Sequence, residues 1–175
     1  MEDELLALET RRRLFEAARK APGSGAREIQ RAAGTGWGET VYHLERLTEA
    51  GLLHRERSGH QDHYFPATVP LGDRRLLRLS RSRSARRVLV TLLESPALTV
   101  PEISKRTGLS AGRLSVHLRR MIEMGITQTG RQGRYRTFDV VDRSGVIRVL
   151  TTYRSGIADQ WIDGLLDTWA ELFRP

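Results

Sequence analysis

The feature that most constrains this chain is an internal repeat. Shifting the sequence by the 74 residues that separate Pro22 from Pro96 aligns the two halves without a gap. Because this period is too long for a solenoid repeat, each copy should be a small globular domain. The identical pairs in this register include Glu28/Glu102, Ile29/Ile103, Gly34/Gly108, His43/His117, Leu44/Leu118 and Gly51/Gly125.

Segment 99–125, in the second copy, carries the signals of two helices joined by a tight turn. Thr99 and Glu102 have the spacing of a capping box, and Gly108 is a usual helix terminator. Beyond the turn, a buried stripe at helical spacing is predicted for Leu114, Leu118 and Met121. This pattern predicts a helix-turn-helix whose second helix has the dimensions to enter a major groove. Its outer face carries the candidate DNA-binding residues Arg113, Ser115, Val116, Arg119 and Arg120.

An extended segment follows each pair of helices, over 52–67 and 126–141, and each contains a glycine turn. Two extended runs around a glycine predict a β-hairpin, which directly after a recognition helix is a wing. The second wing carries the basic candidates Arg131, Arg134 and Arg136. The first wing carries Arg55 and Arg57, diluted by Glu56 and Asp62. The alternative for either wing is an exposed turn with no partner.

The segments 40–53 and 113–126 resemble the recognition helix and the start of the wing in ArsR/MarR-like winged-helix regulators. Over roughly residues 5–142, the chain resembles archaeal DNA-binding proteins with two winged helices in tandem. The resemblance implies a mainly α fold with small β-hairpin wings: two tandem winged helix-turn-helix domains plus C-terminal helices. In the first copy it implies groove contact through Thr40, Val41, Tyr42 and Arg46.

The first copy departs from this pattern. Glu39 and Glu45 flank its reading face, and carboxylates repel phosphates. In addition, the helical pattern turns Thr40 inward, together with Leu44 and Leu47. DNA binding is therefore expected mainly from the second copy.

Four segments are expected: a first domain over 1–70, an arginine-rich, helical connector over 71–84, a second domain over 85–142 and C-terminal helices over 143–175. The connector places Arg74, Arg78 and Arg81 at i, i+4 and i+7, one stripe on a helix. We expect these arginines, Arg78 and Arg81 included, to lie along a phosphate backbone. The alternative is an amphipathic strut packed between the domains.

The net charge of +8 is unevenly distributed. Counting side chains gives −1 over 1–70, +4 over 71–84, +5 over 85–142 and zero over 143–175. The positive field therefore belongs to the second domain and the connector, which favours a polyanion as partner. The alternative is a solvated surface from arginine-rich coding, since only two basic residues are lysines, Lys20 and Lys105.

The C-terminal segment carries an apolar stripe outside the repeat. Its members at helical spacing include Trp161, Leu165 and Trp169. Tryptophans on such a face predict a homodimer interface, and the alternative is a lid over the core of their own domain.

Other chemistry finds little support in the sequence. His60, Asp62 and His63 are weak candidates for a metal site, but neighbouring strand residues point to opposite faces and no cysteine joins them. No nucleophile motif or cofactor motif is present, so neither an enzyme nor a cofactor is expected. No membrane span or signal pattern is visible, and we expect a cytoplasmic, nucleoid-located protein of a prokaryote.

The sequence thus predicts a transcriptional regulator that binds double-stranded DNA mainly through its second winged helix and the basic connector. One alternative is an abundant nucleoid-associated protein with low sequence specificity. The other is a protein–protein adaptor, because winged helices also serve as interaction modules.

Overall fold

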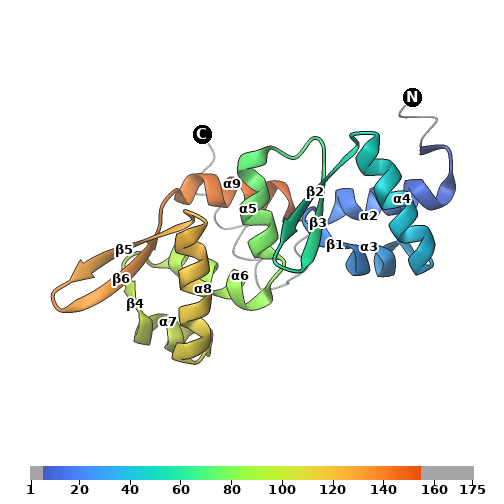
Figure 1. Cartoon of the computed structure of the whole chain (residues 1–175). Helices are drawn as coiled ribbons and strands as arrows, with labels where there is room; N and C mark the ends of the chain where they lie inside the picture. The colour runs from blue at the N-terminus through green and yellow to red at the C-terminus, as the bar shows by residue number, and fades with distance from the viewer. Residues whose placement is uncertain (1–5, 155–175) are drawn as a thin grey trace. The chain divides into compact units, whose positions relative to one another are not determined.

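The computed structural model describes residues 6–154, drawn in colour in Figure 1. Within this range the chain divides into two compact units. The first contains the residues up to 78 together with 153–154, and the second contains residues 79–152.

The first unit packs helices against a small antiparallel sheet. Its elements are α2 (Glu9–Lys20), β1 (Ser24–Gly25), α3 (Ala26–Ala33), α4 (Trp37–Glu49), β2 (Leu53–Ser58), β3 (Gln61–Pro66) and α5 (Leu71–Ser80). The strand order is β1-β3-β2, and the hairpin β2–β3 closes at Ser58 opposite Gln61. The centre of the core is formed by the fully buried Leu14, Ile29, Leu44, Leu47 and Leu53.

The second unit repeats this architecture. Its elements are α6 (Arg83–Glu94), β4 (Leu98–Thr99), α7 (Val100–Thr107), α8 (Ala111–Glu123), β5 (Thr127–Gln132), β6 (Tyr135–Val140) and α9 (Arg143–Thr152). From α6 to β6, each element begins and ends 74 residues after its counterpart in the first unit. The repeat inferred from the sequence therefore extends to the bounds of the helices and strands.

Local signals explain why α7 begins and ends where it does. The carboxylate of Glu102 accepts hydrogen bonds from the Thr99 backbone N–H at 2.7 Å and from its hydroxyl at 2.6 Å. At the other end Gly108 has a φ of 68°, a left-handed conformation that glycine adopts without strain. This confirms the predicted capping box and the predicted stop.

The predicted inner stripe of α8 is also confirmed. Leu114, Leu118 and Met121 are buried together with Ile103 of α7. Because this stripe faces the core, the opposite side of α8 faces solvent. In Figure 1 the hairpin β5–β6 projects beyond the helices of its unit, which is the geometry of a wing. The fold is thus mainly α with two hairpin wings, as the sequence predicts.

The predicted connector, residues 71–84, contains α5 and the first residues of α6. α5 ends at Ser80, and α6 begins at Arg83 with Ser82 as its N-cap. The Ser82 hydroxyl accepts a hydrogen bond from the Ala85 N–H at 3.4 Å. Trp161, Leu165 and Trp169, predicted to form a dimer interface, lie outside the described residues. Within residues 6–154 no helix has the length and apolarity needed to cross a membrane.

Candidate nucleic-acid interface

The outer face of α8 presents every residue that the sequence predicts for it. Arg113, Ser115, Val116, Arg119 and Arg120 are all exposed. At the middle of this face Val116 is 63% exposed, unusually high for an aliphatic side chain. The face therefore combines long guanidinium groups with small side chains between them.

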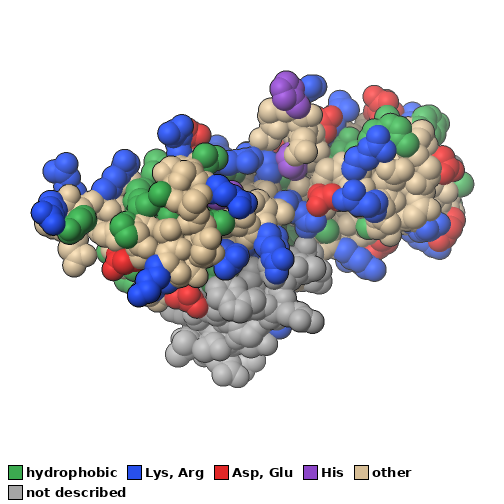
Figure 2. All heavy atoms as spheres, turned by 90° about the horizontal axis from the view of Figure 1, so that it is seen from below, with side chains coloured by type: hydrophobic (Ala, Val, Ile, Leu, Met, Phe, Trp, Pro, Cys, Tyr) green, Lys and Arg blue, Asp and Glu red, His purple; other side chains and the backbone are tan. Residues whose placement is uncertain are grey.

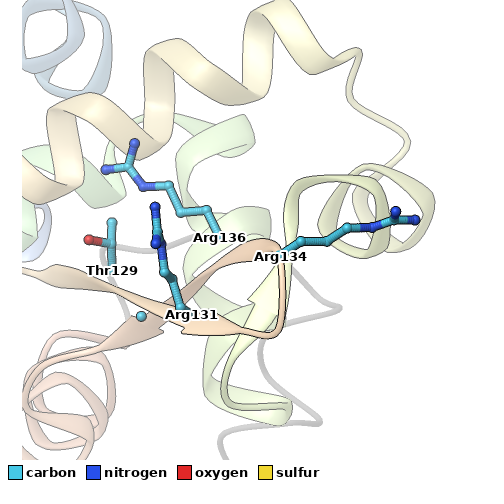
Figure 3. Close-up of a pocket in the computed structure, with 5 residues that line it drawn as sticks. Thr129, Arg131, Arg134 and Arg136 are labelled. Carbon is cyan, nitrogen blue, oxygen red and sulfur yellow. The ribbon is translucent and has the colours of Figure 1, made fainter.

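The second wing places its arginines at the tip of β5–β6. Arg131 and Arg136 are directly opposite each other in the strand register, so they share one face of the hairpin. Figure 3 shows both side chains on the same side as Thr129, whereas Arg134 points away from them. With Gly130, these residues line an open hollow of about 490 Å³.

None of the arginines of α8 or of the second wing is neutralised by a carboxylate of residues 6–154. The arginines of that range that do form ion pairs include Arg12, Arg19, Arg46, Arg74, Arg78 and Arg143, which lie outside α8 and the second wing. Figure 2 shows Lys and Arg side chains projecting from the wing at the left. The positive charge of α8 and this wing is therefore left for an external partner.

His117 lies half-buried on α8 between two of these arginines. Burial lowers the pKa of its imidazole below the usual 6.5, and the charges of Arg113 and Arg120 lower it further. Its counterpart His43 on α4 has its pKa lowered in the same direction, chiefly by burial and then by Arg11.

The first unit places its predicted site residues differently. Thr40 is 0% exposed, and its hydroxyl donates to the Gly36 carbonyl at 2.7 Å. The expectation that Thr40 contacts DNA is therefore wrong in this structure, because the side chain is buried and donates back to a carbonyl of its own helix. Tyr42 is 57% exposed, and Arg46 is exposed but forms an ion pair with Glu49 at 3.0 Å.

The connector arginines also differ from the expectation. Arg74 and Arg78 approach the carboxylate of Glu56 on the first wing at 3.2 Å and 3.6 Å. Their side chains are only 11% and 16% exposed, and Arg74 also donates to the Val69 carbonyl at 3.1 Å. Arg78 therefore braces the first wing instead of lying open to a phosphate backbone. Arg81 lies half-buried in the turn between α5 and α6.

Arg55 and Arg57 are exposed on β2 of the first wing. The weak metal candidates lie nearby, His60 in the turn and Asp62 and His63 on β3. The Nδ1 atom of His63 forms a hydrogen bond with the Gly23 carbonyl oxygen at 2.8 Å. Across the part of the chain that the structure describes, no three His, Cys, Asp or Glu residues gather as metal ligands would.

A position-by-position comparison of the two units shows a contrast that the segment charges conceal. α8 and the second wing carry six exposed arginines, and each has an equivalent position 74 residues earlier in the first unit. Of those six equivalent residues in the first unit, two are arginines, three are acidic and one is a histidine. The pairs are Glu39/Arg113, Glu45/Arg119, Arg46/Arg120, Arg57/Arg131, His60/Arg134 and Asp62/Arg136.

Comparisons with known proteins agree with two such units. A family model described as an N-terminal HTH domain matches residues 8–77, and one described as winged helix-turn-helix DNA-binding matches residues 81–126. An uncharacterized HTH-type transcriptional regulator of Methanocaldococcus jannaschii is 26% identical over 132 residues, which are 75% of this chain. The chain spans only 33% of the length of that relative.

Two solved structures are among those that the chain matches. A structure of disulfide-formed AbfR is 20% identical, with 77% of this chain and 88% of that chain covered and a TM-score of 0.41. Human N-acetylserotonin methyltransferase in complex with SAM is 13% identical, with 88% and 44% covered and a TM-score of 0.27. Neither likeness is close enough to bear on function. Each of the two units thus matches a helix-turn-helix family model, and together these matches support a tandem winged-helix DNA-binding protein.

Proposed function

We propose that the chain regulates transcription by binding double-stranded DNA, with α8 in the major groove and the second wing on the adjacent backbone. The observation that carries this proposal is the set of six arginines on α8 and the second wing that no carboxylate of residues 6–154 neutralises. Arg131 and Arg136 lie directly opposite each other in the hairpin. Because like charges in this position destabilise a hairpin, the pair does not contribute to the stability of the fold.

The side chains of α8 suit the edges of bases. Arginine pairs in bidentate fashion with guanine, and small apolar groups contact the methyl group of thymine. Arg113 and Arg119 would supply the first kind of contact, and Val116 the second. The wing arginines would position the protein by binding phosphates or by entering the minor groove.

The first winged helix has a smaller part in this proposal, since its reading face carries Glu39 and Glu45. A homodimer through the C-terminal stripe would match the two-fold symmetry of many operators and remains a prediction. A DNA target would place the protein in the nucleoid.

Repeat-equivalent arginines give the test a matched control. Arg120→Ala on α8 should weaken binding to a labelled duplex about tenfold or more, measured by fluorescence anisotropy at low salt. Arg46→Ala, its counterpart on α4, should change the affinity less than about twofold, because that guanidinium is paired with Glu49. Equal losses would contradict the leading role of the second unit. If the wild type binds no duplex at low salt, the adaptor function replaces this proposal.

Competition against random duplex separates a regulator from a nucleoid-associated protein. A regulator should prefer a selected site about a thousandfold or more. A preference below about tenfold would instead assign the same surface to an architectural role.

A further inference from the structure

The helices α4 and α8 present ridges of the same geometry and opposite charge. Residues three apart form one of the ridges by which helices pack together. The acidic ridge of α4 consists of Glu39, Tyr42 and Glu45. The basic ridge of α8, 74 residues later, consists of Arg113, Val116 and Arg119. All six side chains are exposed, and both helices belong to equivalent folds.

Each ridge has an apolar centre that its own unit leaves uncovered. Tyr42 and Val116 are both more than half exposed. Beside Tyr42, α4 also exposes Val41 and Trp37, and the Arg27 guanidinium stacks on the Trp37 ring at 3.7 Å. Exposed apolar groups gathered on one helix face mark an interaction surface, because their burial removes apolar area from water.

The charged ends of the ridges are free to pair with a partner. Glu45, Arg113 and Arg119 take part in no ion pair within residues 6–154. Glu39 accepts a hydrogen bond from the Gly36 N–H at 3.2 Å, which caps α4 and holds the carboxylate at the end of the ridge.

We propose that α4 of one copy docks on α8 of a second copy, with Tyr42 against Val116 and the glutamates against the arginines. The spacing fits either crossing direction. An antiparallel pair places Glu45 opposite Arg113, and a parallel pair places it opposite Arg119. Such a contact joins different surfaces of the two copies, so it is head-to-tail. An interface of one helix face on another is small, so the association is weak and weakens further with salt.

This contact regulates the DNA-binding surface. It covers the helix that the proposed function assigns to the major groove, so DNA and self-association compete for α8. The competition rests on the proposed function, whereas the association of copies does not.

Sedimentation equilibrium of the full chain at low salt tests the association. The average mass of the wild type should rise with concentration and fall when duplex DNA or salt is added. Glu45→Arg should weaken the association about fivefold or more, because it replaces an attractive exposed ion pair with a repulsive pair of like charges. Glu94→Arg, the same charge change at an exposed position of α6, should leave it unaltered.

Charge exchange gives the sharper result. Adding Arg113→Glu to Glu45→Arg restores the association if the helices cross antiparallel, and adding Arg119→Glu restores it if they cross parallel. A wild-type mass that is independent of concentration, equal behaviour of the Glu45 and Glu94 variants, or failure of both exchanges would overturn the inference. Duplex binding by the same wild-type sample is measured separately, so DNA binding without association sinks only this inference. Association without DNA binding sinks only the proposed function.

Discussion

At the residue scale, the two units differ in backbone strain at one equivalent position, which is an alanine in the second unit and a glycine in the first. Ala97 has a φ of 56°, where its counterpart Gly23 has 84°. The left-handed conformation costs an L-residue about 1–2 kcal/mol, whereas glycine loses about 0.5–1 kcal/mol of chain entropy on folding. We therefore expect Ala97→Gly to leave the free energy of unfolding unchanged or to raise it by up to about 1 kcal/mol.

The reverse change at Gly23 should be harmful. A Cβ there would meet the Phe65 ring at 3.1 Å in addition to the unfavourable φ, so Gly23→Ala should cost more than about 1 kcal/mol. Urea unfolding measures both variants. Ala32→Gly, on the exposed face of α3, is the control for glycine in general and should cost about 1 kcal/mol. If Ala97→Gly costs as much as this control, the strain at Ala97 has no energetic weight.

His117 gives the second unit a dependence on pH. Because burial and the neighbouring arginines lower its pKa below 6.5, the unfolded chain binds more protons than the folded one just below that value. The free energy of unfolding should therefore be greatest above about pH 6.5 and fall as the pH is lowered towards 5.5. His117→Gln should reduce this fall, and urea unfolding at the two ends of the range measures it. His43 adds a slope of the same sign, so an unchanged slope in the His117 variant would assign the effect to His43 alone.

At the element scale, α5 acts as a brace for the first wing. Glu56 on β2 receives Arg74 and Arg78 from α5, all with largely covered side chains. Glu56→Gln would leave two guanidiniums without their counter-charge in a partly buried site. We expect a loss of about 1–2 kcal/mol in the free energy of unfolding. The control Glu49→Gln breaks the exposed pair with Arg46 and should cost less than about 0.5 kcal/mol. Equal costs would mean that α5 braces nothing.

The elements themselves could largely be predicted, because their signals are local. Capping residues, left-handed glycines and apolar spacing lie within a few residues of what they determine, as at Thr99, Glu102 and Gly108. The partners of Arg74 and Arg78 could not be predicted in the same way. Glu56 lies 18 residues from Arg74, and only the packing of α5 on the hairpin brings them together. The helical stripe of arginines therefore predicts a phosphate-binding face, whereas in the structure Arg74 and Arg78 form ion pairs with Glu56 of the same unit.

At the scale of the whole molecule, the repeat contains more functional information than the net charge. The segment charges predict a basic second domain, but the aligned pairs Glu39/Arg113 and Glu45/Arg119 show where the two copies differ in sign. That comparison needs only the register of the repeat. The exposure of each arginine and its ion pairs come from the structure, since no sequence pattern supplies them. They separate the arginines that are available to a partner from those that carboxylates of the fold already neutralise.

The salt dependence of DNA affinity tests this division between the units. Each phosphate neutralised contributes about −0.9 to the slope of log affinity against log salt concentration. Removing the unpaired wing arginines with Arg131→Ala and Arg136→Ala should therefore make the slope less steep by about 2. The control removes Arg55 and Arg57 from the first wing and should leave the slope within about 0.5 of the wild type. If both double variants change the salt slope equally, both wings contact the phosphate backbone. If neither changes it, the wings do not contact DNA and α8 makes the contact alone.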